Sequence, residues 1–247
     1  MKAAPALFGL LTLALWEAAV RLWHVAPYVL PGPLAIAAAF ATAPGLLLVS
    51  LASTLLVTAV ALALSVVMGV TLALLMAASP WARAAVLPWA IVLQVTPIVA
   101  IAPLIIVWVG NPFAALVVCA TIVAFFPVFS NTAAGLAAAP DEFVDLFRLN
   151  GATRWQILWL LRLPAAVPQF LAGLRVSGGL ALVGAVVAEF VAGSGGVASG
   201  LAYRILEAGY RLQIPRMFAA LVLLSAAGIA INAALGALQR GLLRRMG

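Results

Sequence analysis

Residues 141–164 read DEFVDLFRLNGATRWQILWLLRLP and form the one long polar break late in an otherwise apolar chain. The break contains three of the six acidic residues of the whole sequence, and three arginines accompany them. Apolar stretches long enough to cross a membrane lie on both sides of it. We therefore interpret this segment as a docking element that the rest of the chain holds at a membrane surface.

The composition indicates an integral membrane protein. Of the 247 residues, 67% are hydrophobic and only 8% are charged, whereas about a quarter of the residues of a soluble domain carry charge. The apolar stretches suit helices that cross the roughly 30 Å hydrocarbon core, and they lack the short alternating segments of a transmembrane barrel. The sequence predicts one all-α transmembrane domain over 1–247, with a polar loop at 133–165 and about six spans at 7–23, 46–78, 87–109, 113–132, 170–192 and 217–238.

The basic residues predict how the chain is oriented in the bilayer. Its formal net charge is +7, but the arginines stand at the ends of apolar segments rather than along one face, so we expect no nucleic-acid partner. Placing both termini in the cytoplasm satisfies the positive-inside rule and puts 133–165 there as well. The inner side then collects Lys2, Arg83, Arg148, Arg154, Arg162, Arg240, Arg244 and Arg245, against Arg204, Arg211 and Arg216 outside.

Residues for catalysis or metal binding are missing from the sequence. Lys2 is its only lysine, which excludes a Gly-x-x-x-x-Gly-Lys phosphate loop. One histidine, His24, and one cysteine, Cys119, exclude a zinc cluster and a Cys-His nucleophile pair. We therefore expect a chain that is not an enzyme and binds no metal or cofactor of its own.

Helix start and stop signals divide the polar segment into two short helices. Pro140, followed by two acidic residues, is typical of a helix start, because the missing N–H is tolerated there and the helix dipole favours negative charge. Gly151 supplies the stop, and Thr153 with Gln156 forms the capping box of a second helix. We predict that this second helix ends at Leu163 and Pro164.

Polar residues inside the predicted spans are candidates for lining a pathway. The span at 87–109 carries Gln94, Thr96 and Pro97, and prolines in a span free carbonyl groups that only protein or a watery cavity can cover. A kinked packing helix explains the same residues equally well. Glu189 lies in the span at 170–192, where an acid either lines a substrate route or pairs with a basic residue such as Arg204. Both interpretations stay open.

A specific spacing follows the polar segment. Gly151, nine further residues and then Leu161-Arg-Leu163-Pro164 resemble the cytoplasmic signature Glu-Ala-Ala-x3-Gly-x9-Ile-x-Leu-Pro of ABC importer permeases. Asp145, Leu146 and Phe147 stand at the Glu-Ala-Ala positions, so the acid is shortened and both small residues are replaced by large ones. The sequences at 149–157, 173–175, 187–189 and 29–33 further resemble the branch that imports nitrate, aliphatic sulfonates and taurine, which includes importers of pyrimidine precursors of thiamine.

The resemblance implies a type I importer permease in the bacterial inner membrane. A coupling helix from Pro140 to about Arg154 would dock into a separate ATPase subunit, which binds the ATP. Expected partners are the ATPases, a periplasmic or lipid-anchored binding protein, a second permease copy and the lipid bilayer. The docking residues implied are Phe143, Asp145, Leu146, Phe147, Gly151, Ala152, Thr153 and Arg154.

Three alternatives compete with this interpretation. A secondary transporter would use Glu189 and Glu17 to couple an ion, and its uptake would persist without an ATPase. A membrane scaffold would transport nothing. The polar segment itself would, in the third alternative, be a surface helix in the headgroup layer. Glu17 and Arg21 are four residues apart, which favours an ion pair at the membrane edge over a transport role.

Overall fold

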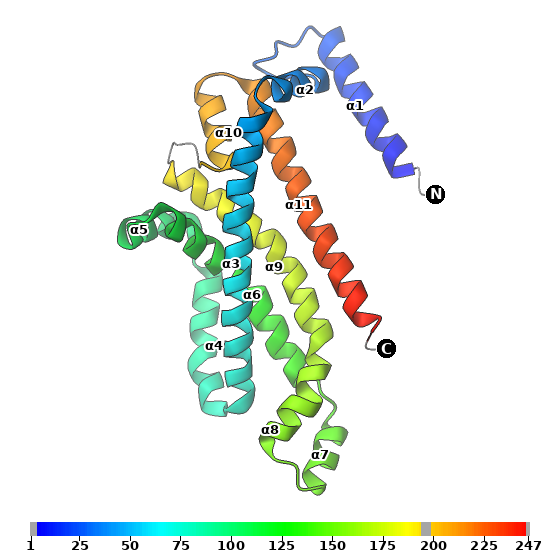
Figure 1. Cartoon of the computed structure of the whole chain (residues 1–247), viewed down its shortest axis with the longest axis vertical. Coiled ribbons are helices and arrows are strands. Elements are labelled where there is room, and N and C mark those ends of the chain that lie inside the picture. The colour runs from blue at the N-terminus through cyan, green and yellow to red at the C-terminus, as the bar shows by residue number, and fades with distance from the viewer. Residues whose placement is uncertain (1–3, 194–198, 246–247) are drawn as a thin grey trace. The chain divides into compact units, whose positions relative to one another are not determined.

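The computed structural model describes residues 4–193 and 199–245, and every element within these ranges is a helix (Figure 1). This confirms the predicted all-α fold class. The elements are α1 (Ala4–Leu22), α2 (Pro33–Thr42), α3 (Pro44–Ala78), α4 (Pro80–Val95), α5 (Ile98–Val109), α6 (Pro112–Ala137), α7 (Asp141–Leu149), α8 (Arg154–Ile157), the π-helical turn η1 (Leu158–Arg162), α9 (Leu163–Ala192), α10 (Leu201–Tyr210) and α11 (Ile214–Leu243).

Four segments in the described ranges are long and apolar enough to span a membrane. They are α3, α6, the continuous stretch Arg154–Ala192 and α11. Taken together, α4 and α5 are also long and apolar enough to span a membrane, and counting them as one broken span gives five. The sequence predicted six spans, and the difference arises at 7–23, which corresponds to α1 and is not among these segments.

The span predicted at 87–109 is not one continuous helix. Two helices, α4 and α5, cover this region and are bent by 103° at the break between them. Thr96 has an extended backbone with ψ of 122° and Pro97 precedes the first turn of α5. A proline disfavours the helical conformation in the residue before it and has no N–H to continue the ladder, and at Pro97 the chain bends instead of continuing as one helix.

The predicted helix end at Leu163 and Pro164 is wrong. The helix that begins at Arg154 continues without a break to Ala192. The turn before the proline is the π-helical segment η1, in which the N–H of Leu163 donates to the carbonyl of Leu158, five residues back. A wider turn of this kind re-routes the hydrogen bonds at the point where Pro164 offers no donor, so the chain passes the proline as a helix.

The chain divides into two compact units. The first combines Met1–Thr54 with Gly193–Ala227, and the second combines Leu55–Ala192 with Gly228–Gly247. The first unit has an apolar core that includes Ile36, Leu47 and Leu201. A buried hydrogen bond adds to this core, since the Leu201 N–H donates to Thr54 Oγ1 at 2.9 Å.

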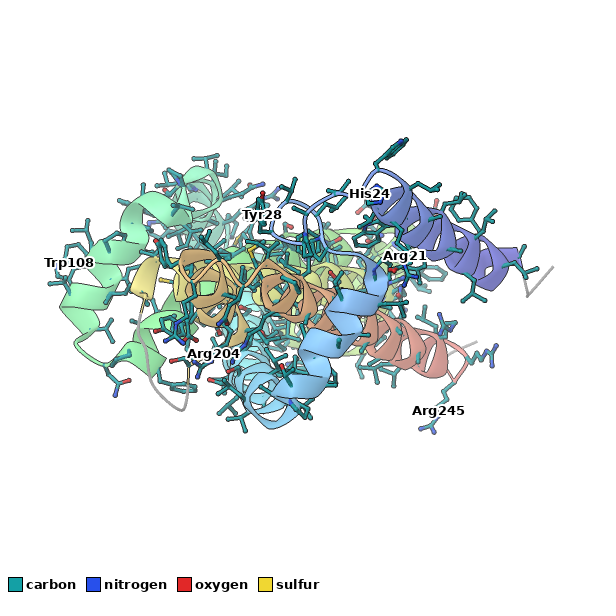
Figure 2. The ribbon with its side chains drawn as sticks, turned by 90° about the horizontal axis from the view of Figure 1, so that it is seen from above. Arg21, His24, Tyr28, Trp108, Arg204 and Arg245 are labelled. Atoms are coloured by element: carbon teal, nitrogen blue, oxygen red, sulfur yellow. The ribbon has the colours of Figure 1, made fainter. Side chains whose placement is uncertain are left out.

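The predicted ion pair of Glu17 and Arg21 is confirmed. Arg21 Nε lies 2.7 Å from Glu17 Oε1, and the second carboxylate oxygen of Glu17 accepts the Leu34 N–H in the first turn of α2 at 3.1 Å. Glu17 therefore joins α1 to α2. Figure 2 shows Arg21 and His24 at the end of α1, where the chain enters the loop that carries Tyr28.

The second unit is built on α6 and α9, which pack along most of their length (Figure 1). Small residues permit this approach. A Cβ on Gly173 would lie 2.6 Å from the Pro127 carbonyl oxygen, and one on Gly184 would lie 2.8 Å from Ala120 Cα. Ser177 Oγ donates to the Ala124 carbonyl at 2.6 Å. Close backbone contact and interhelical hydrogen bonds are what hold helices together in lipid, where apolar burial gives little advantage.

Candidate functional site

The polar segment forms a helical corner in which α7 and α8 follow the end of α6 and lead into α9 (Figure 1). α7 begins with Asp141 and Glu142 in its first turn and has Arg148 in its last turn, which suits the helix dipole at both ends. Arg148 also pairs with Asp145 at 3.1 Å, but both side chains are about two-thirds exposed. Such a surface pair contributes little to stability.

Gly151 ends α7 in a Schellman motif. Its φ of +75° lies in the left-handed region, which glycine adopts without strain. The Gly151 N–H donates to the Arg148 carbonyl and the Ala152 N–H donates to the Phe147 carbonyl, both at 2.9 Å. These two bonds, with apolar packing of Ala152 and Phe147 in one cluster, define the motif. The glycine stop predicted from the sequence is confirmed.

The predicted capping box at the start of α8 is confirmed as well. The Thr153 N–H donates to Gln156 Oε1 at 2.7 Å, and the Gln156 N–H donates to Thr153 Oγ1 at 3.3 Å. With the Schellman motif on one side and the capping box on the other, local hydrogen bonds hold both ends of the turn at 150–153. The angle between α7 and α8 is therefore fixed by the segment itself.

The side chains of α7 divide into an inner and an outer apolar face. Val144 is buried with Ile157 of α8, and Phe147 packs against them. Phe143, Leu146 and Leu149 instead point outward, with exposed fractions of 52%, 51% and 86%. These three lie at i, i+3 and i+6 and so share one side of the helix. Inner packing thus holds α7 in place while a second apolar face stays open.

A groove of about 380 Å³ adjoins the outer face. Leu146 and Phe147 of α7, Gly151 and Ala152 of the turn, and Gln156 line it. With Phe143 on the open face, the structure gathers five of the eight predicted docking residues around this groove and face.

The other three predicted docking residues lie apart from the groove. Asp145 is exposed and pairs with Arg148. Thr153 serves as the cap of α8. Arg154 lines a different cavity on the inner side of the corner, with Arg148 and Arg162.

The predicted pathway residues of the α4–α5 junction are brought together in part. Gln94 and Thr96 line one cavity of about 310 Å³ with residues of α5, α6 and α9, while Pro97 forms the corner beside it. Thr96 Oγ1 donates to the Val92 carbonyl at 2.6 Å, which satisfies the hydroxyl within its own helix. The side-chain amide of Gln94 is a polar group in the mostly apolar wall of this cavity.

Glu189 is placed elsewhere. It is only 3% exposed and lies near the end of α9, whereas the residue of α9 that lines the Gln94 cavity is Leu180. Nine residues of helix separate the two positions, roughly 14 Å along the axis. Glu189 therefore does not line the cavity that Gln94 and Thr96 share.

Two residues of interest were missed by the sequence analysis. Leu149 extends the outer face of α7, and its i+6 spacing from Phe143 was the available signal. Arg175 lies in the spanning part of α9, is exposed, and donates from Nε to Asn232 Oδ1 at 2.8 Å. An arginine inside a predicted span was visible in the sequence, and such residues usually face protein or water rather than lipid.

Metal binding has no structural support in the described ranges. Within 4–193 and 199–245, three or more His, Cys, Asp or Glu side chains nowhere gather in a group that could hold an ion.

Known proteins match this chain along most of its length. The family described as binding-protein-dependent transport system inner membrane component matches residues 65–247. The riboflavin transport system permease protein of Chloroflexus aurantiacus is 37% identical, covering 95% of this chain and 87% of its own. The formylaminopyrimidine transport permease protein of Halalkalibacterium halodurans is 34% identical, covering 97% and 94%. A putative aliphatic sulfonates transport permease protein of Bacillus subtilis is 32% identical over 62% of this chain and 54% of its own.

A solved structure supports the fold. The crystal structure of an amino acid ABC transporter with histidines superposes with a TM-score of 0.66, covering 81% of this chain and 96% of that one. Sequence identity is 21%, so this likeness concerns the fold alone.

Proposed function

Because the chain belongs to the family of binding-protein-dependent transport system inner membrane components, the permease subunits of ABC transporters, we propose that it moves a small solute across the inner membrane under the control of a separate ATPase. The family resemblance inferred from the polar segment is thereby established. The chain is a membrane transport component and not an enzyme.

One observation carries the proposed coupling to an ATPase. The apolar side chains Phe143, Leu146 and Leu149 are exposed on a helix that local hydrogen bonds fix to the turn after it. A rigid helix that presents a continuous apolar face to a groove is a recurring mode of protein recognition. In this proposal the ATPase provides the groove, and movement of the ATPase displaces α7 as a body.

One continuous helix, Arg154–Ala192, would carry this movement into the membrane. α8 passes through η1 into α9 without a break, so a displacement at Thr153 acts directly on the spanning helix. α9 in turn packs closely on α6 through Gly173 and Gly184. Because such close backbone contact leaves no room to deform, the two helices would move together.

For the solute we propose a nitrogen heterocycle of the pyrimidine or flavin kind as the first candidate. The two relatives that cover nearly the whole chain are named for riboflavin and formylaminopyrimidine. A sulfonate-type anion is the second candidate, favoured by Arg175, a positive charge within a spanning helix. Gln94, Thr96, Pro97 and Glu189 remain proposed pathway residues.

The proposal includes three kinds of partner. A periplasmic or lipid-anchored binding protein would deliver the solute, two ATPases would drive the cycle, and a second copy of this chain would complete the pore. Both termini would lie in the cytoplasm, the compartment into which α7 would project.

Reconstitution tests this proposal. The permease, its ATPase and its binding protein would be placed in liposomes with ATP inside, and uptake of radiolabelled heterocycle would be compared with uptake of a sulfonate. We expect uptake that needs ATP and the binding protein. Uptake with a catalytically inactive ATPase would instead identify an ion-coupled carrier, and calorimetry with the binding protein would separate the two solute classes.

A further inference from the structure

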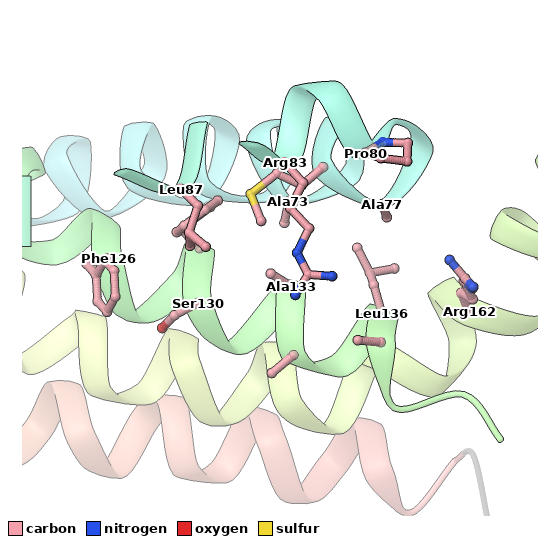
Figure 3. A pocket seen from close by; sticks show the side chains of 14 residues that line it. Ala73, Ala77, Pro80, Arg83, Leu87, Phe126, Ser130, Ala133, Leu136 and Arg162 are labelled. Carbon is pink, nitrogen blue, oxygen red and sulfur yellow. The ribbon is translucent and has the colours of Figure 1, made fainter. Parts of the chain in front are cut away.

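A cavity of about 390 Å³ opens in the second unit between α3, α4, α6 and η1 (Figure 3). Its wall is mostly apolar and includes Ala73, Leu87 and Phe126. Two arginines enter this apolar setting from different elements: Arg83 from the first turn of α4 and Arg162 from η1. Figure 3 shows the Arg83 side chain extending from α4 across the cavity towards α6, where Ser130 adds a hydroxyl.

The two positive charges have no acidic partner in the described ranges. Neither Arg83 nor Arg162 forms an ion pair there, and no aspartate or glutamate is among the described residues that line the cavity. Arg162 Nε is buried and lacks a hydrogen-bond partner within the same part of the chain. A buried donor of this kind destabilises the protein unless an acceptor satisfies it.

A second cavity of about 790 Å³ adjoins the first on the side of α7 and α8. The two share Ala77, Pro80 and Arg162 in their walls. The second cavity is lined by Arg148 and Arg154 as well, again with no acid among its described lining residues. Four arginines therefore line these two neighbouring cavities, and among the described residues only Arg148 has an ion-pair partner, Asp145.

We infer from the exposed tryptophans near these cavities that the region lies at a membrane boundary. Trp81, the residue after Pro80 of the first cavity's wall, is 81% exposed, and Trp155 is 63% exposed in the wall of the second cavity. Exposed tryptophans gather at the level of the lipid headgroups, where an aromatic ring contacts both apolar and polar surroundings. An apolar wall with cationic side chains at this depth suits a molecule that has acyl chains and an anionic head.

We propose that the cavity lined by Arg83 and Arg162 binds the phosphodiester headgroup of an anionic phospholipid. The phosphate oxygens would accept hydrogen bonds from the two guanidinium groups, including the buried Arg162 Nε. The acyl chains would leave along the apolar wall. Basic pockets between spanning helices bind acidic lipid headgroups in this manner. The bound lipid would brace α3 and α4 against η1, next to the helical corner.

The test uses the full chain purified in a zwitterionic detergent. Fluorescent phosphatidylglycerol and phosphatidylcholine would be titrated in mixed micelles, and retained lipid would be counted by native mass spectrometry. We expect the protein to prefer phosphatidylglycerol, and each arginine replaced by glutamine to weaken that binding about fivefold. Arg83→Lys should stay close to the wild type because it keeps the charge.

Matched variants separate a site from general surface charge. Arg240→Gln combined with Arg244→Gln removes the same net charge from exposed positions at the end of α11 and should leave the preference unchanged. If this control weakens binding as much as Arg83→Gln combined with Arg162→Gln, the proposal is overturned. If the Arg162 variant does not fold, Arg83→Gln alone tests the proposal. Arg83 is exposed, so its replacement should not prevent folding.

A last arm distinguishes a lipid from a soluble anion. Inorganic phosphate at millimolar concentration should not displace phosphatidylglycerol, because it lacks the acyl chains that the apolar wall would hold. Displacement by phosphate, or equal binding of the two lipids, would overturn the lipid assignment.

Discussion

Arg175 of α9 donates a 2.8 Å hydrogen bond from its Nε to the Oδ1 of Asn232 in α11. This bond orients a charged side chain between two helices that are long and apolar enough to span a membrane. If Arg175 lines the solute route, Asn232 is the residue that positions it.

We predict that Asn232→Ala lowers transport much more than stability. One interhelical hydrogen bond in a membrane contributes about 0.6 kcal/mol, so the melting temperature should change little, whereas a misplaced arginine should reduce uptake severalfold. Uptake in liposomes and thermal unfolding would be measured on the same preparation. Gln239→Ala, on the same helix, is the control and should leave both unchanged. Equal and small losses of uptake in Asn232→Ala and Gln239→Ala would exclude Arg175 as a pathway residue.

The outer face of α7 gives the second prediction. Phe143→Asp combined with Leu146→Asp should weaken ATPase binding by about 2 kcal/mol or more, roughly thirtyfold, because buried apolar anchors dominate such interfaces. Co-purification and surface plasmon resonance would measure it. Phe143→Leu combined with Leu146→Met keeps the face apolar and should retain the complex. Undiminished binding of the aspartate variant would contradict the docking role.

The Schellman turn gives the third prediction. Gly151→Ala should strain the turn by about 1–2 kcal/mol, because its φ of +75° is unfavourable for a residue with a Cβ. Since no neighbouring atom lies within 4 Å of the place that a Cβ would occupy, the effect is one of backbone conformation and not of collision. Hydrogen exchange of the α7 amides should therefore speed up in the alanine variant. Gly151→Asn should be milder, because asparagine tolerates the left-handed region. Identical exchange in all three proteins would argue against this account.

The seam between α6 and α9 gives the fourth prediction. Gly173→Ala should destabilise the protein by about 1–3 kcal/mol, because the new methyl group would lie 2.6 Å from the Pro127 oxygen. Gly179→Ala, in the same helix but with nothing within 4 Å, should be neutral or stabilise by up to about 1 kcal/mol. Thermal unfolding in detergent compares the two. If Gly173→Ala is as stable as Gly179→Ala, the close contact at Gly173 does not contribute to the stability of the α6–α9 packing.

The fifth prediction concerns pH. A hydrogen bond from Arg204, and then the charges of Arg204 and Arg211, hold the pKa of Glu207 below its ordinary value of 4.5. Because the folded pKa is lowered, this contribution to stability is complete above about pH 4.5 and is lost as the pH falls through the folded pKa. Melting temperature should therefore decrease on acidification in the wild type, and less steeply in Glu207→Gln. Parallel pH profiles would exclude Glu207 as a source of the decrease.

The local structure of residues 141–157 could be predicted from the sequence because its determinants are neighbours in the chain. Pro140, Gly151 and the pair Thr153 and Gln156 act over distances of three or four residues, and the structure contains the helices, the stop and the cap where these residues predict them. The spacing to Leu161-Arg-Leu163-Pro164 indicated the family for the same reason, since it is a property of the chain alone.

The tertiary structure decides whether the chain bends or stays helical at a proline. Pro97 ends a helix in a 103° bend, whereas Pro164 is carried inside a continuous helix by a π-helical turn, although both stand in apolar sequence. A proline removes one donor in either case, and whether the chain bends or re-routes its hydrogen bonds depends on what packs around it.

The sequence by itself therefore determined the membrane class, the family and the polar corner, because composition, motif spacing and helix caps are local properties. Only the tertiary structure decided that Gln94 and Thr96 share a cavity that excludes Glu189, and that Arg83 and Arg162 line one cavity. The physical reason is that these relationships join residues of different helices. Close packing of helix on helix sets them, and no short-range pattern in the chain encodes it.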